Sequence, residues 1–335
     1  PAYKEDKVII PAIYSFLQQD YPRELYDIIV ISDQMQESTN EALRQLPVRL
    51  LIADYTDSSK AKAMSLAMNA TADIPYDAVV IMDADNTAGT SFLSELNPVF
   101  QSGARAVQAH RTAKNTNTDI AVLDAASEEI NNSIFRSGHI ALGLSSALIG
   151  SGMALEACWF RQHIHLLETA GEDKEMEALL LKQRIHIEYL EHVYVKDEKT
   201  QKKEGIKNQR KRWIAAQFDS LVRALPDFPK ELLRGNIDYC DKVFQWTLLP
   251  RIILIFCTFF FTILVTLVSP YSSIKWWILA FALFLALFTA IPGHLLNKQL
   301  LRAIFQLPSL LLGIASYLFK LKGVNKKFIH TEHGN

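Results

Sequence analysis

The distribution of apolar residues divides the chain into two parts. In the first two-thirds, short apolar runs alternate with segments that carry charged residues, a pattern typical of a soluble domain. From Pro250 to Phe319 the chain is dominated by Leu, Ile, Phe and Ala. A chain of 335 residues, 49% of them apolar, can therefore hold one large α/β domain and an apolar appendage.

Strand-like and helix-like segments alternate along the first part. Short, mostly apolar runs predict strands buried on both faces of a sheet, at residues 27–32, 48–52, 78–82 and 104–109. Helical patterns bounded by capping or turn residues lie between them, at residues 8–19, 37–46, 59–70 and 91–101. This alternation predicts right-handed crossovers and a mainly parallel sheet. Ligands bind at the carboxyl ends of such strands, so polar residues after each run are candidate site residues.

Acidic residues follow two of these runs. Asp33 comes after the first run, and Asp83-Ala84-Asp85-Asn86 comes after the third. Two aspartates one residue apart at a strand end can divide the work: one contacts a ribose or sugar and the other ligates Mg²⁺ or Mn²⁺. Asp-x-Asp is also common in ordinary loops, so the pair alone indicates only a candidate metal site.

Two further polar segments lie later in the chain. Ala170-Gly171-Glu172-Asp173 opens a predicted helix that continues over residues 174–184. A carboxylate there can act as a base in group transfer, but the helix dipole also favours acidic residues in a first turn. A basic stretch that starts near Lys199 contains Gln209-Arg210-Lys211-Arg212-Trp213, which anionic lipid headgroups would attract. Nothing else in the sequence supports nucleic-acid binding.

The order of these segments resembles a known family. Asp33, Asp83-Ala84-Asp85, Glu172-Asp173 and Gln209-x-x-Arg212-Trp213 are similar to the D, DxD, (T/G)ED and QxxRW motifs of family 2 glycosyltransferases with the GT-A fold. That grouping includes cellulose, hyaluronan and poly-N-acetylglucosamine synthases and non-processive relatives. The resemblance covers about residues 1 to 220, and the four-part order is more specific than any single motif. It implies a Rossmann-like α/β catalytic domain with a mainly parallel sheet.

The opening of the chain resembles the same family. Pro1-Ala2-Tyr3-Lys4-Glu5 is similar to a PAYNE-type motif, with Lys4 where Asn is usual. The resemblance implies that Tyr3 and Glu5 lie near the uracil and ribose of a donor. The chain starts without Met, signal peptide or leading strand, so we expect a fragment that lacks an upstream strand, with a membrane helix as a further candidate.

Two small-residue segments extend the resemblance. Lys60-Ala61-Lys62-Ala63 is similar to a GKxxAL element, which implies that Lys62 approaches the nucleotide, although Ala61 replaces the usual Gly. Gly143-Leu144-Ser145-Ser146 and Gly150-Ser151-Gly152-Met153 are similar to an acceptor-side segment of membrane members. Glycine there lets backbone approach a ligand, and ordinary turn chemistry is the alternative explanation.

The resemblance implies roles at the donor. Asp33 would hydrogen-bond the uracil, Asp83 the ribose or donor sugar, and Asp85 would ligate Mg²⁺ or Mn²⁺. Gln209 and Arg212 would hold the diphosphate, since the forked guanidinium matches phosphate oxygens. A UDP-sugar is the expected donor because the family most often uses UDP.

The resemblance also implies roles in catalysis. Asp173, next to Glu172, would be the general base. Trp213 would cap the acceptor end of the site, because its ring face suits the apolar side of a sugar. An acceptor hydroxyl deprotonated by Asp173 would attack the anomeric carbon in line, with inversion.

The apolar part predicts membrane segments. Residues 252–268 and 276–291 lack charges over lengths near the lower limit for a span, with a turn predicted at residues 270–273. Tyr271, Trp276 and Trp277 are placed like an interfacial belt. Residues 300–319 contain charged and polar residues and can either cross the membrane or lie in its surface.

Basic residues after residue 319 favour a cytoplasmic end and hence two crossings. We expect a multi-pass protein of the bacterial inner membrane with a cytoplasmic catalytic domain, in which residues 213–225 form a further interfacial helix. The expected parts are a GT-A domain (1–225), an interfacial linker (226–249), a transmembrane hairpin (250–291), and a third membrane or interfacial helix with a basic cytoplasmic tail (292–335).

Composition narrows the remaining possibilities. A formal net charge of −1 gives no argument for a nucleic-acid partner. The three cysteines are far apart, so neither a disulfide framework nor a zinc site is indicated. The histidines have no metal-ligand spacing, and we expect surface or structural roles for most of them.

Three functions follow from these observations. The favoured one is an inverting hexosyl- or N-acetylhexosaminyltransferase that adds a sugar to a lipid-linked or growing glycan, in cell-surface or extracellular polysaccharide synthesis. A processive β-glycan synthase is the alternative, although two crossings are few for a secretion channel. A catalytically inactive nucleotide-sugar-binding membrane protein is the alternative from another class. The two apolar segments have almost no charged residues, which argues against a pore made by this chain alone.

Overall fold

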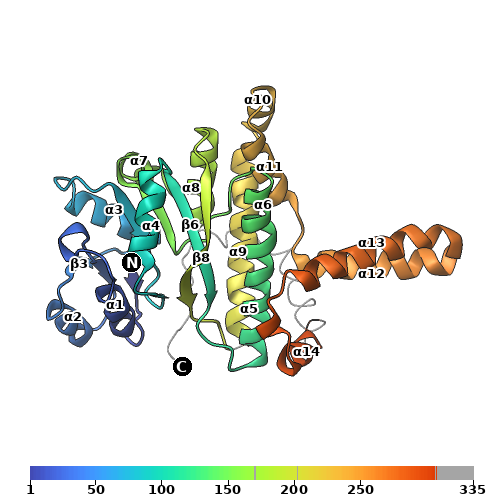
Figure 1. Ribbon diagram of the computed structural model, residues 1–335, viewed down its shortest axis with the longest axis horizontal. Coiled ribbons are helices and arrows are strands. Elements are labelled where there is room, and N and C mark those ends of the chain that lie inside the picture. Colours follow the sequence, from blue (N-terminus) through green and yellow to red (C-terminus); the bar gives the residue numbers. More distant parts are fainter. Residues whose placement is uncertain (170, 202, 306, 308–335) are drawn as a thin grey trace.

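The computed structural model describes residues 1–169, 171–201, 203–305 and 307, and it has an α/β body from which a pair of helices projects (Figure 1). Three parallel strands form the first sheet, in the order β1 (Ala2–Tyr3), β2 (Ile29–Asp33) and β3 (Arg49–Ala53). The connecting helices are α1 (Ile9–Leu17), α2 (Glu37–Arg44) and α3 (Lys60–Ala70), with the short 3₁₀ helix η1 (Arg23–Leu25). This region confirms the predicted alternation of strands and helices.

The second sheet is mixed, so the prediction of a mainly parallel sheet is wrong for this half. Its strand order is β4 (Ala78–Ile81), β7 (Met153–Glu156), β6 (Ala106–Ala113), β8 (Ile187–Asp197) and β5 (Thr87–Ala88). Only β6 and β8 pair in parallel, and the other neighbours are antiparallel. The sequence did not reveal β5 and β7, because β5 has two residues and β7 follows a glycine-rich turn.

The central strand β6 has two buried faces. Along β6, Ala106 belongs to one apolar cluster and its neighbour Val107 to the other, as alternation along a strand requires. Helix α4 (Phe92–Gln101) covers one face through Phe92 and Leu96. The opposite face packs against helices that include α7 (Ala157–His163) and α8 (Glu172–Lys182). The remaining short helical segments are η2 (Ser133–Ser137), α6 (Gly138–Ala141) and η3 (Ile164–Leu166).

Two long helices lie side by side beyond this sheet, α5 (Asp119–Asn132) and α9 (Lys203–Ala224) (Figure 1). Helix α9 runs without a break through the basic motif and the residues after it. Its later residues are buried in the protein, among them Ile214, Ala215 and Ala224. Residues 213–225 therefore do not form the separate interfacial helix that we expected, because their apolar face packs on the body of the protein.

Residues 226–249, expected as an interfacial linker, are folded. They form α10 (Phe228–Leu233) and α11 (Ile237–Thr247). Tyr239, Val243 and Trp246 of α11 belong to the largest apolar cluster of the body. This segment extends the body, because its apolar residues recur on one face of a helix.

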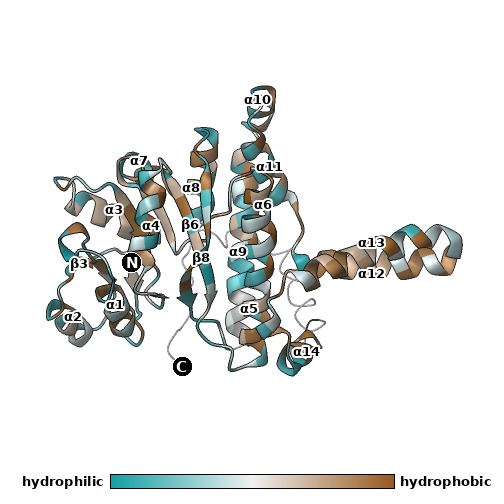
Figure 2. Cartoon of the chain, viewed as in Figure 1, coloured by the Kyte–Doolittle hydropathy of each residue, from teal (hydrophilic) through white to brown (hydrophobic). Residues whose placement is uncertain are grey.

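The apolar part forms the expected hairpin, with α12 (Arg251–Val268) and α13 (Pro270–Thr289) side by side (Figure 1). The expected turn at residues 270–273 is instead the first turn of α13, since proline is well suited to the first position of a helix. Both helices are long and apolar enough to cross a membrane, and only 11% of each is buried. Figure 2 shows the apolar colouring along much of their length.

A short segment returns from the hairpin to α5. It comprises η4 (Gly293–Leu295) and α14 (Lys298–Ile304), and its Leu295 and Leu300 pack against Val122 and Ala125 of α5. Most of the helix predicted at residues 300–319, and the basic tail after it, lie outside the described residues.

Candidate functional site

One cavity of about 1550 Å³ brings together residues from all four motifs. Its lining includes ten of the predicted site residues: Tyr3, Glu5, Asp33, Asp83, Asp85, Glu172, Asp173, Gln209, Arg212 and Trp213. They come from β1, β2, the turn after β4, the start of α8, and α9. Carboxylates that are far apart in the sequence therefore face one space.

Lys60 is the residue of this site that the sequence did not single out. Its ammonium group donates to the Asp83 carboxylate and to the carbonyl oxygen of Gly150, at 2.7 Å for the latter, and it lies 3.7 Å from Glu172 Oε1. Burial alone would lower the pKa of Lys60, but the charges of Asp83 and Glu172 outweigh burial and raise the pKa. Lys60 therefore keeps its positive charge and lies among the carboxylates of the site.

Lys62, which the resemblance pointed to, is placed elsewhere. Its ammonium donates to the carbonyl oxygen of Asp57 at 2.7 Å and lies 5.8 Å from the centre of the Tyr55 ring. Lys62 is not among the described residues that line the cavity. Residues two positions apart on a helix face different directions, so only one of the two lysines of α3 can reach the site. The sequence does place Lys60 in the first turn of this helix, next to the strand ends, and this position could have identified it.

Gly150 shows how closely the site is packed. Its φ is +81°, a conformation that glycine adopts without strain. A Cβ atom built on it would lie 3.7 Å from Lys60 Nζ, 3.8 Å from Glu172 Oε1 and 3.9 Å from Asp173 Oδ2. The two acidic side chains and the lysine thus meet at the backbone of the predicted acceptor-side segment.

Glu172 and Asp173 are the first two residues of α8, in the first helical turn where the sequence placed them. Burial, together with the neighbouring charge of Asp173, raises the pKa of Glu172 to about 7, although Lys60 opposes the shift. Asp173 Oδ1 accepts from the backbone N–H of Lys174 at 2.9 Å, which fixes the orientation of its carboxylate.

Asp33 ends β2, with only 3% of its surface exposed. It accepts a hydrogen bond from Ser58 Oγ at 3.0 Å, and burial raises its pKa. Nearby, Lys4 and Gln34 have φ values of +56° and +55°, which are unusual for residues other than glycine. Asparagine tolerates this conformation better than lysine does, which gives a physical reason for the Asn that is usual in place of Lys4.

The turn after β4 is held by the end of β8. Asn86 is fully buried, and its side-chain N–H groups donate to Asp85 Oδ1 at 3.3 Å and to Asp197 Oδ1 at 3.2 Å. The backbone N–H of Glu198 donates to Asp85 Oδ2 at 3.0 Å. The Asp85 carboxylate is thus oriented by neutral donors toward the cavity.

Asp85 could hold a metal ion only together with further ligands, which a bound nucleotide sugar would add. Among the described residues, no three His, Cys, Asp or Glu side chains lie close enough together to hold a metal ion. Mg²⁺ is commonly held by one or two carboxylates together with phosphate oxygens. A carboxylate that lines the cavity and accepts hydrogen bonds from the neutral N–H groups of Asn86 and Glu198 fits that arrangement.

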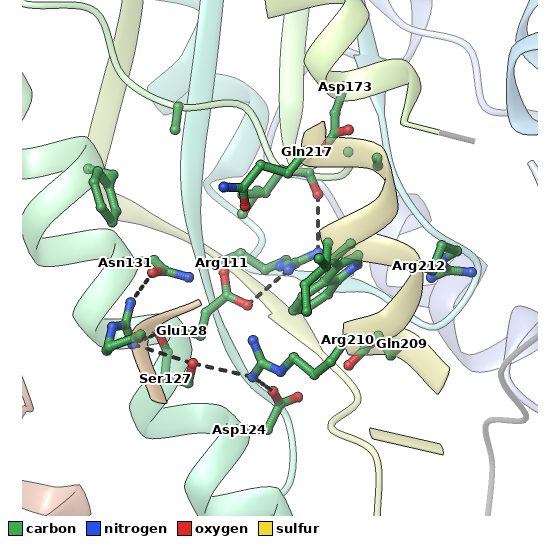
Figure 3. A pocket seen from close by; sticks show the side chains of 18 of the residues that line it. Arg111, Asp124, Ser127, Glu128, Asn131, Asp173, Gln209, Arg210, Arg212 and Gln217 are labelled. Atoms are coloured by element: carbon green, nitrogen blue, oxygen red, sulfur yellow. Dashed lines mark hydrogen bonds and ion pairs between the residues drawn. The ribbon is translucent and has the colours of Figure 1, made fainter. Parts of the chain in front are cut away.

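The basic motif on α9 presents its residues to different sides. Figure 3 shows Arg210 directed toward Asp124 and Ser127 of α5, whereas Arg212 lies on the other side of α9. The Arg210 guanidinium lies 4.8 Å from the centre of the Trp213 ring. Gln209 Oε1 is buried and has no hydrogen-bond partner among the described residues. An unpaired buried oxygen of this kind is suited to a ligand.

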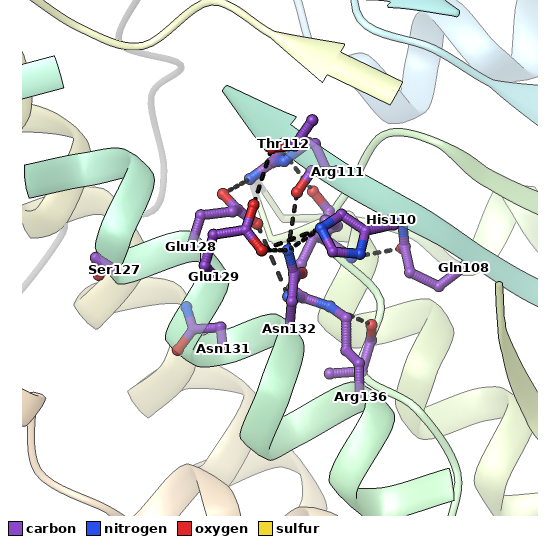
Figure 4. A network of polar contacts seen from close by, with 12 residues as sticks. Gln108, His110, Arg111, Thr112, Ser127, Glu128, Glu129, Asn131, Asn132 and Arg136 are labelled. Atoms are coloured by element: carbon purple, nitrogen blue, oxygen red, sulfur yellow. Dashed lines mark hydrogen bonds and ion pairs between the residues drawn. The ribbon is translucent and has the colours of Figure 1, made fainter. Parts of the chain in front are cut away.

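A buried network of charges forms part of the cavity lining and was not predicted from the sequence; Figure 4 shows Glu128 and Arg111 of this network. Glu128 pairs with Arg111 at 2.9 Å and with Lys199 at 3.1 Å, and Lys199 also pairs with Asp197 at 2.8 Å. Burial alone would raise the pKa of Glu128, but Arg111 and Lys199 hold it well below the usual value. Buried charges persist when each has a partner, and this network ties α5 to the end of β8.

The histidines have structural contacts, as expected. His110 Nε2 lies 3.0 Å from Glu129 Oε2, and His163 stacks on Trp159 with ring centres 4.4 Å apart. His186 Nδ1 lies 3.6 Å from Asp238 Oδ2.

Comparison with known proteins identifies one family. Residues 1–216 match the family model described as "Glycosyltransferase like family 2". No curated protein matches the chain.

Solved structures are similar only at low identity. The mannosyltransferase PcManGT from Pyrobaculum calidifontis, in complex with GDP-Man and Mn²⁺, is 16% identical over 86% of this chain and 84% of its own, with a TM-score of 0.49. S. aureus TarS 1-349 in complex with UDP-GlcNAc is 11% identical over 97% and 88%, with a TM-score of 0.49. The complex of TarS 1-349 with UDP is 13% identical over 66% and 64%, with a TM-score of 0.43, so the match spans less than two-thirds of that relative.

The raised pKa of Glu172 predicts a pH dependence of stability. Between the usual pKa of 4.5 and about 7, the folded protein keeps a proton that the unfolded chain has lost. The free energy of unfolding should therefore fall as the pH rises through this window, and Glu172→Gln should remove that part of the slope. Thermal unfolding in detergent across the window measures this. The exposed Glu24→Gln variant is the control, and an unchanged slope in Glu172→Gln would contradict the assignment.

Proposed function

The chain belongs to glycosyltransferase family 2, and on that premise we propose that it transfers a sugar, with inversion, from a UDP-sugar to a lipid-linked or growing glycan at the cytoplasmic face of a bacterial inner membrane. The observation that carries the proposal is the convergence of Asp33, Asp83, Asp85 and Asp173 on one cavity. The α/β body with its two sheets agrees with the GT-A class. A relation to the β-glycan synthases remains a prediction.

The donor would lie along the carboxyl ends of β1, β2 and β4. Tyr3, Glu5 and Asp33 line the cavity and would contact the nucleoside, and Asp83 would contact the ribose or sugar. Asp33 is suited to this role because, among the described residues, Ser58 is the one side-chain donor to its buried carboxylate, so an oxygen remains for a base N–H.

The diphosphate would bind to the cationic and amide groups of the cavity. Lys60 is placed for it, because its ammonium already lies between Asp83 and Glu172 and can exchange part of this pairing for a phosphate oxygen. Gln209 and Arg212 are the corresponding groups on α9. Asp85 would hold a Mg²⁺ or Mn²⁺ ion, which when bound neutralises charge on the leaving diphosphate.

Asp173 would act as the general base. Its carboxylate lines the cavity and is oriented by the backbone N–H of Lys174, so it is available to an acceptor hydroxyl. In the reaction, the acceptor hydroxyl oxygen forms a bond to the anomeric carbon as its proton passes to Asp173. The bond between that carbon and the diphosphate oxygen breaks, and the nucleoside diphosphate leaves.

The hairpin would anchor the enzyme in the membrane. A core helix of a soluble protein is mostly buried, whereas α12 and α13 leave large apolar side chains such as Phe256, Ile263 and Phe281 about half exposed or more. An apolar surface of this extent needs an apolar partner, and a bilayer supplies one.

The catalytic assignment predicts the effect of Asp173→Asn. The amide cannot accept the hydroxyl proton, so nucleotide release from donor and acceptor should fall by about a hundredfold or more. Binding of UDP with Mn²⁺ should remain, because Asp173 is not assigned to the nucleotide. The exposed Asp20→Asn variant is the control, and full release by Asp173→Asn would exclude Asp173 as the base.

The two lysines of α3 provide a matched pair of variants. Lys60→Gln removes the positive charge between Asp83 and Glu172, so KM for the donor should rise about tenfold or more. Lys62→Gln should change it little, because Lys62 is bound to Asp57 outside the cavity. Steady-state kinetics over a donor series measures both. A larger rise in KM for Lys62→Gln than for Lys60→Gln would favour Lys62, as the GKxxAL resemblance implied, and would contradict the role of Lys60.

The membrane assignment predicts how the chain fractionates. After alkaline carbonate extraction of membranes, the full chain should remain in the pellet, because a spanning hairpin is not released by removing electrostatic contacts. Release into the supernatant would contradict a spanning hairpin.

A further inference from the structure

The cavity does not end at the carboxylates. It continues between α5 and α9 to the base of the hairpin, where its lining includes Ile255, Phe259, Phe284, Phe288 and Leu301. The same cavity thus has a polar end with carboxylates and an apolar end formed by α12, α13 and α14. A molecule that fills it needs a polar group at one end and an apolar chain at the other.

Arg251 lies between these two ends. It is the first residue of α12 and is partly buried. Its guanidinium donates to Asn131 Oδ1 and, at 3.3 Å, to the carbonyl oxygen of Ser127. Both partners are neutral. Among the described residues, no carboxylate forms an ion pair with Arg251. A partly buried cation with only neutral partners favours an anionic ligand.

Arg210 reaches the same place from α9. Its guanidinium pairs with Asp124 Oδ1 at 2.6 Å and donates to Ser127 Oγ at 3.2 Å. Arg251 Nη1 lies 3.5 Å from the same Ser127 Oγ. Two guanidinium groups therefore meet at Ser127. Among the described residues, the two arginines have one ion-pair partner in all, which is Asp124. Figure 3 shows Arg210, Asp124, Ser127 and Asn131 gathered on this side of the cavity.

We propose that Arg251 and Arg210 bind a phosphate group of the acceptor. In this acceptor, the phosphate links an apolar chain to the group that receives the sugar. The inference rests on the proposed function and names the class of its acceptor. Guanidinium groups match phosphate oxygens with parallel N–H donors, and the apolar lining beyond them suits a hydrocarbon chain. This site lies toward the hairpin, whereas Lys60 lies among the carboxylates, so acceptor and donor phosphates have separate cations.

An anionic phospholipid headgroup has the same phosphate chemistry as such an acceptor. Arg251 begins the first hairpin helix, where a headgroup could also lie. The experiment therefore has to separate a phosphate on a single apolar chain from a bulk phospholipid.

The test measures equilibrium binding of farnesyl phosphate and of farnesol to the full chain in phosphatidylcholine nanodiscs. Farnesyl phosphate should bind more tightly than farnesol. Arg251→Gln should weaken farnesyl phosphate binding about tenfold or more and leave farnesol binding unchanged, and Arg251→Lys should weaken it less because the charge remains without the fork. The exposed Arg44→Gln variant, whose partner is Glu37, should bind as the unmodified chain does.

Three results would overturn the inference. Unchanged farnesyl phosphate binding in Arg251→Gln would exclude the arginine as a ligand. Equal loss of both probes would show that Arg251 only supports the contact between α5 and α12. Full competition by phosphatidylglycerol added to the nanodiscs would assign the site to bulk lipid.

A parallel binding measurement with UDP and Mn²⁺ separates this inference from the proposed function. If the unmodified chain and Arg251→Gln bind UDP equally but neither distinguishes farnesyl phosphate from farnesol, the acceptor inference fails and the donor site stands. If the unmodified chain binds no UDP, the proposed function itself fails.

Discussion

The site depends on one buried positive charge among carboxylates. Asp83 lies in the turn after β4 and Glu172 begins α8, and without compensation their carboxylates would repel each other. The Lys60 ammonium lies between them and is held in place by the carbonyl oxygen of Gly150. An anionic donor can take over part of this pairing, so the charge that stabilises the two carboxylates is also the charge that would receive the substrate.

A second constraint connects the site to the membrane part. The buried network around Glu128 ties α5 to the end of β8, whose next residue orients Asp85. On its other side, α5 contacts Arg251 at the start of the hairpin and packs against α14. One helix thus contacts both the elements that carry the carboxylates and the elements that supply the apolar end of the cavity.

Much of this arrangement could be predicted from the sequence, because local patterns determine it. The strands β2, β3, β4 and β6 and their helices follow from apolar runs and capping residues such as Ser59, whose side chain accepts from the Lys62 N–H. The order of the acidic motifs predicted residues that line one cavity. The antiparallel pairing of β7 was missed because partner choice is a long-range property. Lys60 was missed because a motif alignment gives a position but not the direction of a side chain.

The most direct test of the account is a cryo-EM structure of the full chain in a lipid nanodisc with UDP and Mn²⁺. We expect the nucleotide along the ends of β1, β2 and β4, with its diphosphate beside Lys60 and Asp85 and with α12 and α13 inside the bilayer. A nucleotide bound away from this cavity, or Asp33, Asp85 and Asp173 in separate regions of the map, would contradict it.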